Sequence, residues 1–548
     1  MHQLYKSMAE MIASGLRRKS VQKCSRWAEE YRVMGAPFPG KWTFKYHPWL
    51  REMHDSTAQF NCGMKSAQGG FTETVLNRVF YNVDVRALDC LYVLPAQTPD
   101  AHDFSASRFN AALELSPHLG NLFSDVQNIG HKRAGATNLY IRGSRSRSGL
   151  KAIPTACIIL DELDEMTQEN IPLALERAAG QKEKEVWAIS TPTIPGEGIN
   201  VWYQDSTQES FYFKCPSCSK STTLIFPQCL EVVGDHINDP RLEESYIKCK
   251  ECSAKLEHHL KYEWLKDGFW VPEKQHGKRG FHINQLYSST VTPGEIANWY
   301  MMSMRDVFYE QQLYNSKLGL PHIVAGAGVT DANIDACIGG HRNNTLKRGL
   351  NTMGVDIGKV IHFNIDNWHI QNAGTTDPNA MATPETISFG KVQEFDELDP
   401  LMRAYNISSC IVDINPDTRK AWEFACRFPG LVRLCRYTEG VTGRVINVKT
   451  DEDNKPVIHV DRTTWLDLSL GRFKNGSIKI PMDTNLEYRS QIKANVRVYD
   501  FDRWGQRVGR YRKKQSDEDH YAHARNYSEI ALPFALSIKT HQDLEHIP

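Results

Sequence analysis

KSAQGGFT, at residues 65–72, has the length and the ending of a phosphate-binding loop, although not its usual letters. Such loops read GxxxxGK[ST], with backbone N–H groups that cradle phosphates and a hydroxyl group on Mg²⁺. Gly70 and Thr72 occupy the last glycine position and the hydroxyl position, whereas Phe71 stands where the lysine is usual. Lys65 stands where the first glycine is usual, so its cation could reach the phosphates from the other end of the loop. Taken alone, the segment fits a glycine-rich turn before a helix equally well.

Two strand-like segments downstream favour the phosphate-binding interpretation. IILDE (158–162) is an apolar run that ends in Asp161 and Glu162. In that position one carboxylate can hold Mg²⁺ and the next can polarise the attacking water. The alternative is a solvated acidic turn. AISTPT (188–193) ends in the hydroxyls of Ser190 and Thr191, where many ATPases place a sensor of the γ-phosphate. The order of loop, acidic strand and hydroxyl strand predicts ATP hydrolysis.

With these residues the chain resembles the GpA-type (lambda-like) family of phage large terminases. That family also carries its lysine early in the loop, in a K-S-A-Q/R-x-G-x-[ST] pattern. Other segments that look similar are SRWAEEYR (25–32), YHPW (46–49), PAQTPDAHDFSASRF (95–109) and IRGSRSRSG (141–149). The resemblance covers about residues 25–535.

The resemblance implies roles for the residues of the ATP site. Lys65 would be the phosphate-loop lysine, Thr72 the Mg²⁺ hydroxyl, Asp161 the metal carboxylate and Glu162 the catalytic base. Ser190 and Thr191 would couple hydrolysis to movement. The residues expected to contact ATP are Tyr46 and Trp49 near the adenine, Lys65, Ser66, Ala67, Gln68, Gly69, Gly70, Phe71 and Thr72 in the loop, and Asp161, Ser190 and Thr191 at the strand ends. Arg145 and Arg147 would be arginine fingers for a neighbouring subunit, or contacts to DNA or solvent.

Two cysteine pairs predict a structural zinc site. Cys215 and Cys218 form one CxxC pair, and Cys249 and Cys252 form the other. Each pair presents two thiolates from one tight turn, and two such turns complete a tetrahedron with no open coordination position. The alternative, four reduced core cysteines, fits poorly because CPSC and CKEC are polar and turn-like.

A second set of acidic residues lies in the C-terminal part. Asp356 ends the apolar run GVDIG (354–358), and Asp413 ends CIVD (410–413) in the same way. DEDHYAHA (517–524) opens a helix. Three acids from two strand ends and one helix can hold two divalent metals for phosphodiester cleavage. This is the pattern of RNase H-like nucleases, and the family resemblance assigns that fold here. The alternative for Asp356 and Asp413 is ordinary acidic strand ends.

The third metal ligand is ambiguous. Many terminases have D-H-x-x-D at this helix, with the final aspartate as the ligand, and here that position is His523. Asp519 and His523 lie four residues apart and share one helix face. Asp519 is favoured as the ligand, with His523 assisting as a ligand or proton shuttle, and His520 is the weaker alternative.

Composition excludes some classes of protein. Lysine plus arginine and aspartate plus glutamate are equal at 65 each, which argues against stoichiometric coating of nucleic acid. A motor that grips DNA through local patches is compatible with this balance. Candidate phosphate contacts are Lys132, Arg133, Arg142, Arg145, Arg147 and Lys151 near the acidic strand, and Arg503, Trp504, Arg507, Arg510, Arg512, Lys513 and Lys514 before the last helix. No apolar run reaches the ~20 residues of a membrane span and no signal peptide is evident, so the host cytoplasm is expected.

The predicted fold class is α/β, with a P-loop (ASCE-type) ATPase, an inserted zinc ribbon and an RNase H-like nuclease domain. The expected boundaries are a helical segment at 1–44, the ATPase core at 45–209, the zinc ribbon at 210–262, a helical linker or lid at 263–345 and the nuclease at 346–548. The resemblance implies a large terminase subunit that moves double-stranded DNA into a procapsid and cuts it. It also implies ATP, Mg²⁺ or Mn²⁺ and Zn²⁺ as cofactors, and as partners a small terminase subunit, the portal and copies of itself in a ring.

Two other functions remain open from the sequence. One is a helicase or other DNA-remodelling ATPase whose C-terminal region is nuclease-like but inactive. The other is a zinc-bearing scaffold without ATP turnover, against which Thr72, Asp161 and Glu162 weigh.

Overall fold

A computed structural model describes residues 23–151, 153–371, 377–438, 443–450, 455–502 and 505–544. The first 22 residues of the expected helical segment at 1–44 and the Arg503–Trp504 pair lie outside these ranges. The chain divides into two compact units, Met1–His322 and Ile323–Pro548. Each unit is described by itself.

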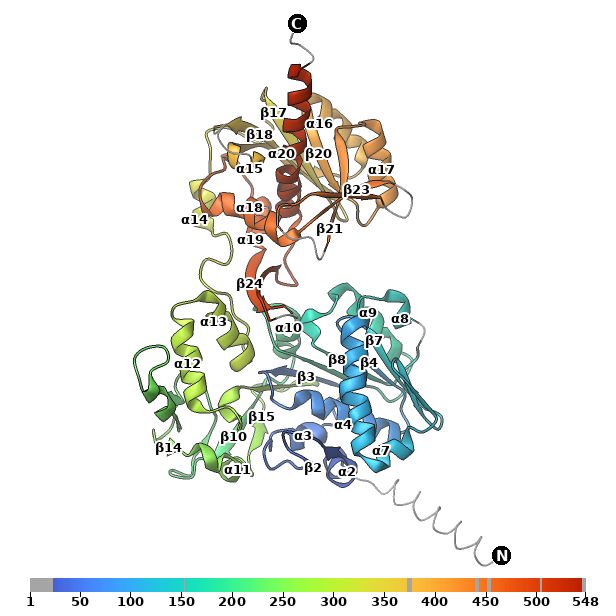
Figure 1. The fold of residues 1–548 in the computed structure, drawn as a ribbon, viewed down its shortest axis with the longest axis vertical. Helices are drawn as coiled ribbons and strands as arrows, with labels where there is room; N and C mark the ends of the chain where they lie inside the picture. The colour runs from blue at the N-terminus through green and yellow to red at the C-terminus, as the bar shows by residue number, and fades with distance from the viewer. Residues whose placement is uncertain are drawn as a thin grey trace, which may run out of the picture. The chain divides into compact units, whose positions relative to one another are not determined.

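The first unit is built on an 11-stranded sheet (Figure 1). Its core strands β10, β16, β3, β9, β8, β4 and β7 are parallel neighbours in that order. The strands of this unit are β1 Val33–Met34, β2 Gly40–Lys41, β3 Phe60–Lys65, β4 Cys90–Leu94, β5 Val126–Asn128, β6 His131–Ala134, β7 Thr137–Gly143, β8 Cys157–Asp161, β9 Glu185–Ser190, β10 Glu209–Lys214, β11 Ser221–Thr222, β12 Leu230–Glu231, β13 Tyr246–Lys248, β14 Lys255–Leu256, β15 Phe269–Val271 and β16 Lys278–Ile283.

Helices cover both faces of this sheet. Tyr92, Ile159 and Trp187 pack with Phe71 and Val75 of α4 on one face. On the other face, alternate residues of the same strands pack with α9 and α10. The helices are α2 Cys24–Tyr31, α3 Leu50–His54, α4 Phe71–Asp84, α5 His102–Phe104, α6 Ala111–Leu115, α7 Pro117–Leu122, α8 Arg147–Lys151, α9 Ile171–Leu175, α10 Gly198–Gln204, α11 Lys261–Trp264, α12 Pro293–Ser303 and α13 Val307–Gln312. Parallel strands that are buried on both faces explain the continuous apolar runs in the sequence.

Two predictions about this unit need correction. Residues 263–345 were predicted to be helical, but β15 and β16 lie within them and β16 pairs with β3 in the middle of the sheet. The short segment KRGFHI (278–283) has no long apolar run, so its burial depends on its neighbours rather than on its own pattern. The expected zinc insertion is also continuous with the main sheet, because β10 pairs in parallel with β16.

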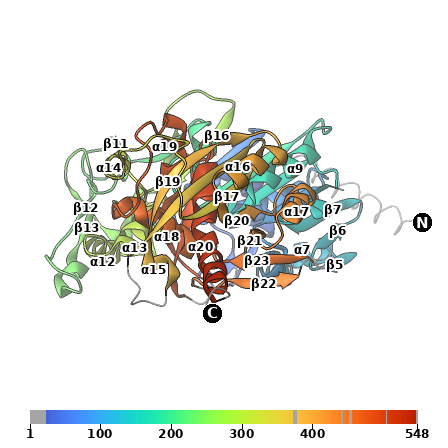
Figure 2. The same ribbon diagram turned by 90° about the horizontal axis from the view of Figure 1, so that it is seen from above.

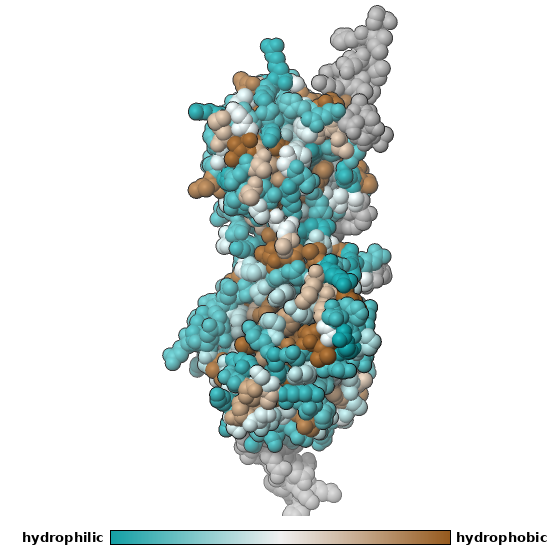
Figure 3. All heavy atoms as spheres, turned by 90° about the vertical axis from the view of Figure 1, so that its left-hand side faces the viewer, coloured by the Kyte–Doolittle hydropathy of each residue, from teal (hydrophilic) through white to brown (hydrophobic). Residues whose placement is uncertain are grey.

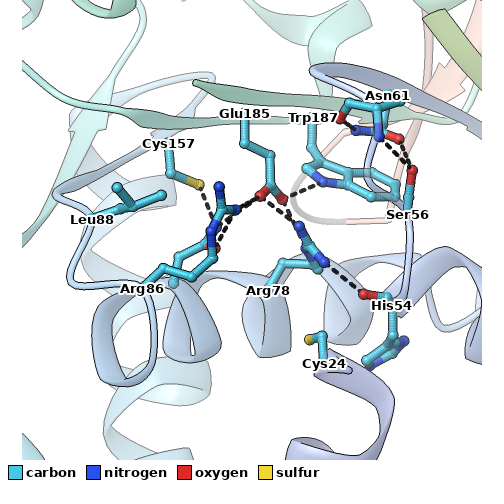
Figure 4. A network of polar contacts seen from close by, with 12 residues as sticks. Cys24, His54, Ser56, Asn61, Arg78, Arg86, Leu88, Cys157, Glu185 and Trp187 are labelled. Atoms are coloured by element: carbon cyan, nitrogen blue, oxygen red, sulfur yellow. Dashed lines mark hydrogen bonds and ion pairs between the residues drawn. The ribbon is translucent and has the colours of Figure 1, made fainter. Parts of the chain in front are cut away.

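A buried ionic network fastens α4 to the sheet (Figure 4). Arg78 of α4 donates to both carboxylate oxygens of Glu185 at 2.7 and 2.5 Å. Trp187 Nε1 donates to Glu185 Oε1 at 2.8 Å, and Arg86 Nη1 lies 2.7 Å from Oε2. Glu185 begins β9, whereas Ser190 ends it. The network therefore anchors the strand at the end away from the predicted phosphate site.

The second unit contains a seven-stranded sheet in the order β19-β18-β17-β20-β21-β23-β22. The strands β17, β20, β21 and β23 are parallel, whereas β18 is antiparallel to both of its neighbours. The strands are β17 Leu350–Ile357, β18 Ile361–Ile370, β19 Ala382–Val392, β20 Ile407–Asp413, β21 Val432–Tyr437, β22 Asn447–Thr450 and β23 Pro456–Val460, with a separate hairpin of β24 Val496–Phe501 and β25 Arg507–Arg512.

Helices also cover both faces of the second sheet. Val412 packs with Phe424 on the α17 side, whereas its neighbour Ile411 packs with Tyr527 of α20. Figures 1 and 2 show α20 lying along the strands. The helices are α14 Asp331–Ala336, α15 Pro378–Met381, α16 Leu398–Ala404, α17 Thr418–Arg427, α18 Arg462–Lys474, α19 Leu486–Lys493 and α20 His520–Leu544.

The surface agrees with the composition. On the face drawn in Figure 3, both units expose mainly hydrophilic residues, with hydrophobic ones in small patches. Among the described residues, no helix has the length and apolar character needed to cross a membrane.

Candidate ATP and nuclease sites

The segment 65–72 forms a tight loop between β3 and α4. Lys65 is the last residue of β3, and Gly70 precedes α4 with a φ of 82°. A Cβ atom at Gly70 would lie 2.6 Å from Leu50 Cδ1, so both the backbone angle and the space require glycine. Phe71 sits directly beneath Gly63, where an added Cβ would lie 2.4 Å from the ring. The phenylalanine in the usual lysine position is therefore a packing residue of the helix start.

Surrounding segments fix the position of the loop. The amides of Ser66 and Ala67 donate to the carbonyls of Ile283 and Ser316 at 3.1 and 2.8 Å. Trp49 Nε1 donates to Gly69 O at 2.9 Å. The first turn of a helix leaves its backbone N–H groups without intrahelical acceptors, and here that turn, at the start of α4, faces a cavity. The loop can thus present amides to an anion without first having to order itself.

That cavity has a volume of about 750 Å³. Most of the predicted ATP-binding residues line it, together with the predicted catalytic base Glu162: Tyr46, Lys65, Ala67, Gln68, Gly69, Gly70, Phe71, Thr72 and Thr191. Tyr46 stacks on Phe38 with ring centroids 4.5 Å apart, which gives the cavity an aromatic wall. This volume lies within the range of small-molecule sites.

The prediction that Trp49 contacts adenine is wrong. Its side chain is buried, and its ring packs against Phe211 and Tyr287. Trp49 supports the phosphate loop from behind instead. Ser66, Asp161 and Ser190 are buried and do not line the cavity either, and Ser190 accepts a hydrogen bond from the amide of Asp164.

The two acidic residues at the end of β8 face different surroundings. Glu162 adopts a left-handed backbone conformation and accepts a hydrogen bond from Lys65 Nζ at 2.7 Å. Asp161 is buried, and Tyr92 donates to its Oδ2 at 2.6 Å. Burial and the neighbouring Glu162 raise the pKa of Asp161 to about 7. Although burial opposes it, the carboxylates of Glu162 and Asp161 hold the pKa of Lys65 above its ordinary value.

The donor set at Asp161 fits a divalent cation. Its Oδ1 is buried and has no hydrogen-bond partner in the described part of the chain. An unsatisfied buried carboxylate oxygen is costly, and a cation would remove that cost. Mg²⁺ held here would neutralise phosphate charge during ATP hydrolysis.

Arg108 was missed by the sequence reasoning. It lies in a π-helical turn, Ser105–Asn110, and lines the cavity beside Thr72 and Glu73. Its Nη1 lies 3.4 Å from Glu73 Oε1, and its side chain is 56% exposed. Arg108 lies in the segment 95–109, which resembles the terminase family, but no motif spacing within that segment distinguishes it from its neighbours.

The four cysteines come together in a symmetric pair of turns. Cys215 and Cys218 lie in the turn between β10 and β11, and Cys249 and Cys252 in the turn between β13 and β14. Each first cysteine accepts at its carbonyl from the amide four residues on, from Ser219 in one turn and Ser253 in the other. One ligand atom from each cysteine lies within 4.8 Å of all the others. Cys215 Sγ and Cys252 Sγ are 3.9 Å apart, close to the ~3.8 Å expected for a tetrahedron with Zn–S bonds of ~2.3 Å. The thiolate set fits Zn²⁺.

In the second unit, Asp356 is the penultimate residue of β17, and Asp413 is the last residue of the adjacent parallel strand β20. Burial, together with the nearby charge of Asp356, raises the pKa of Asp413 to about 6. Two carboxylates on neighbouring strands are a donor set suited to a divalent cation. His520 Nδ1 lies 2.7 Å from Asp356 Oδ2, and His520 stacks on His362 at 4.7 Å.

The surroundings of Asp519 differ from the expectation for a metal ligand. His523 Nε2 lies 3.0 Å from Asp519 Oδ2, which agrees with the predicted shared helix face. Lys513 Nζ lies 3.4 Å from Oδ1, and Arg462 Nη2 lies 3.8 Å from Oδ2. Although burial opposes it, contact with the His523 ring and the charges of Lys513 and Arg462 hold the pKa of Asp519 well below its ordinary value. Asp519 is engaged by protein cations, and it is His520 that contacts Asp356.

The basic clusters also differ from the sequence expectation. Lys132 is buried, and its Nζ donates to Asn110 Oδ1 at 2.8 Å, so it is not a surface contact for DNA. Arg142 donates to the carbonyl of Ile141 at 2.9 Å. The remaining DNA contacts stay predictions.

A protein-family model matches part of the first unit. Residues 36–270 match the model described as "Phage terminase large subunit gpA, ATPase domain". Over these residues the chain is similar to the ATPase domain of the gpA family of phage terminase large subunits. The match contains the phosphate loop, the acidic strand and all four cysteines of the CxxC pairs. No curated protein matches the chain.

Several solved structures are similar to the chain. The large terminase of bacteriophage HK97 has 11% identity and a TM-score of 0.45, and the match covers 92% of this chain and 98% of that one. The ATPase domain of the large terminase of Thermus phage P74-26 has 13% identity and a TM-score of 0.28, with 50% and 92% covered. The large terminase nuclease of thermophilic phage G20c has 11% identity and a TM-score of 0.23, with 37% and 97% covered.

Proposed function

We propose that this chain is a large terminase subunit that hydrolyses ATP in the first unit to drive double-stranded DNA into a procapsid. The observation that carries the proposal is the cavity that brings Lys65, Thr72 and Glu162 together on a family-matched ATPase sheet. The strand β9 lies between β3 and β8, the arrangement of ASCE-type ATPases. The small subunit, the portal and a ring of copies are the partners that such a role requires.

In this proposal the residues of the ATP site have different roles in hydrolysis. The amides at the start of α4 and Lys65 bind the phosphates, Thr72 and Asp161 hold Mg²⁺, and Glu162 accepts a proton from the attacking water. The Lys65–Glu162 ion pair has a consequence for this scheme. Because Glu162 is paired at 2.7 Å, Lys65 must turn toward the phosphates before Glu162 is available as a base.

Glu162→Gln tests the assignment. We expect ATP turnover to fall about 10²–10⁴-fold, the usual contribution of a general base, with nucleotide binding retained. Glu169→Gln, at an exposed glutamate outside the cavity, is the matched control and should turn over ATP at the wild-type rate. Turnover in Glu162→Gln that equals the control would refute the role of Glu162.

We further propose that the second unit is an RNase H-like nuclease that cuts concatemeric DNA with Mg²⁺ or Mn²⁺. The support is its strand order, with the second strand of the sheet, β18, antiparallel to both of its neighbours, and the carboxylates of Asp356 and Asp413 near neighbouring strand ends. A bound metal would activate water and stabilise the leaving oxygen. The metal ligands are Asp356 and Asp413, with the third position among Asp519, His520 and His523.

One observation favours the runner-up function, a DNA-remodelling ATPase with an inactive nuclease-like unit. Lys513, Arg462 and His523 already surround Asp519, the carboxylate expected to complete the metal site. A cleavage assay with plasmid DNA in Mn²⁺ separates the two functions. The nuclease proposal expects cutting by the wild type and none by Asp356→Ala, with the ATPase rate unchanged. If the wild type cut no DNA with any divalent metal, the nuclease proposal would be wrong and the DNA-remodelling ATPase would remain.

We also propose that the four cysteines bind structural Zn²⁺ in a ribbon. The thiolates leave no coordination position open for a substrate, so the role is to hold the two hairpins together.

A further inference from the structure

A second cavity, of about 490 Å³, lies in the second unit away from the carboxylates. It is lined by the end of α17, the start of β21 and parts of β22, β23 and α20. Val432 at the start of β21 is level with Cys410 of β20, three residues before Asp413. The cavity therefore opens toward the amino ends of these strands, whereas Asp356 and Asp413 lie at the carboxyl ends.

The wall of this cavity is apolar. Its larger side chains are Trp422, Val432, Leu434, Pro456, Ile458 and Phe534. Its volume suits a bulky side chain with the backbone that carries it. None of the lining residues that the structure describes is acidic.

Arg433 is the one cation among the described lining residues. Its Nη1 is buried and has no hydrogen-bond partner in the described part of the chain. The guanidinium carbon lies 4.5 Å from the centroid of the Phe534 ring, which keeps the group against the cavity wall. Burying a guanidinium nitrogen without a hydrogen-bond acceptor is energetically unfavourable. An anion bound in the cavity would supply the acceptor and remove that cost.

We propose that this cavity binds a carboxylate that stands beside a bulky apolar side chain on a peptide segment of a protein partner. The guanidinium fork of Arg433 would receive the carboxylate, because arginine binds planar two-oxygen anions with paired N–H groups. The apolar wall would receive the side chain. Nucleic acid is a poorer fit, since a polyanion needs several cations and the described lining supplies one.

Matched peptides test this directly. The probe is N-acetyl-leucyl-(4-fluoro)phenylalanine with a free carboxylate, and its comparison is the same peptide with a C-terminal amide. Binding to the full-length chain is followed by the ¹⁹F line width of the peptide. We expect the carboxylate form to bind about tenfold or more tightly than the amide, the difference expected for hydrogen bonds to a charged group.

Two variants connect that difference to one side chain. Arg433→Met should reduce carboxylate binding to the level of the amide, and Arg433→Lys should restore part of the preference. Arg436→Met, on the same strand but exposed and outside the cavity, is the control and should keep the full preference. Equal thermal unfolding of the three variants and the wild type shows that the fold is retained.

Several outcomes would overturn the proposal. These are equal binding of the two peptide forms to the wild type, binding of neither, or an unchanged preference in Arg433→Met. Displacement of the bound peptide by a short DNA duplex at physiological salt would also overturn it, because the cavity would then take nucleic acid. ATP turnover is expected to be the same in all variants, since the ATPase residues belong to the other unit.

Discussion

At the scale of single residues, the first unit relies on buried charge that is fully paired. Glu185 is 2% exposed and accepts hydrogen bonds from Arg78, Arg86 and Trp187. Removing one member of such a group leaves the other charges buried without compensation. The cost of that is larger than the net worth of the intact pair.

Glu185→Gln is therefore expected to destabilise the first unit by about 3–5 kcal/mol, the range for breaking a buried ion pair. The measurement is the free energy of unfolding in urea. Glu183→Gln is the control, because Glu183 meets Arg86 at the surface, at 3.3 Å and with 68% of its side chain exposed. A similar small change in both variants would contradict the importance of the buried network.

His54 gives the first unit a pH dependence. Burial lowers the pKa of His54 to about 3, and its ring is bonded to Leu50 O and to Asn77. Below pH ~6.5, His54 is protonated in the unfolded chain but stays neutral in the folded chain. The free energy of unfolding therefore decreases as the pH falls. The loss is about 1.4 kcal/mol per pH unit between ~6.5 and ~3.

Urea unfolding of the wild type and of His54→Gln at about pH 7 and pH 5 measures this effect. The variant is less stable at pH 7 because it loses ring packing, but its stability should fall less between the two pH values. Parallel loss of stability in both proteins would show that His54 is not the source.

At the scale of elements, one glycine positions the helix α20, which begins directly after Asp519 and carries His520 and His523. A Cβ atom at Gly354 of β17 would lie 2.0 Å from the carbonyl oxygen of Ala524 and 2.2 Å from the amide nitrogen of Ser528. Only glycine lets α20 approach the strand this closely. The helix is held further along by Arg525 and Glu529, which are buried and paired at 2.7 Å.

Gly354→Ala should push α20 away from the sheet and destabilise the second unit by about 3 kcal/mol, at the upper end for overpacking. DNA cleavage should be lost with it, whereas ATP turnover stays. Gly471→Ala is the control, because a Cβ there meets nothing within 4 Å and alanine favours the helix α18. The measurements are thermal unfolding and DNA cleavage assays of the two variants, and equal results for both would contradict the role of Gly354.

The two CxxC turns are both needed to complete the proposed zinc site. Each turn alone supplies two thiolates, and the proposed Zn²⁺ would tie β10–β11 to β13–β14. Cys252→Ser should lower the zinc content well below stoichiometric and lower the unfolding temperature of the first unit. Cys426→Ser, at an exposed cysteine in the other unit, should change neither. Zinc analysis by mass spectrometry with full retention of metal in Cys252→Ser would contradict the site.

At the scale of the whole molecule, the two proposed chemistries belong to separate compact units. Separate cores predict two thermal transitions. Mg²⁺ with a slowly hydrolysed ATP analogue should raise only the transition of the first unit, by about 2.7 kcal/mol of stability at a hundredfold excess over the Kd. Scanning calorimetry measures this, and Lys65→Ala should abolish the shift. A shift of both transitions would show that the units unfold together.

Much of the architecture could be predicted from the sequence because it is carried by local patterns. The apolar runs that end in Asp161, Asp356 and Asp413 are strands with those residues at their carboxyl ends. The CxxC pairs are turns, since two thiolates at that spacing need a tight backbone. The phosphate loop lies between a strand and a helix, as its glycines require.

Other features depend on which segments meet in the folded chain. Whether Trp49 faces a nucleotide or supports a loop depends on Phe211 and Tyr287, which lie far away in the sequence. The placement of β16 beside β3, the pairing of Lys65 with Glu162 and the approach of Arg462 to Asp519 all join residues from separate elements. Hydrophobic periodicity and spacing determine elements and their ends, because these follow from interactions a few residues apart. The neighbours that set burial and charge at a site are chosen only when the sheets and helices pack.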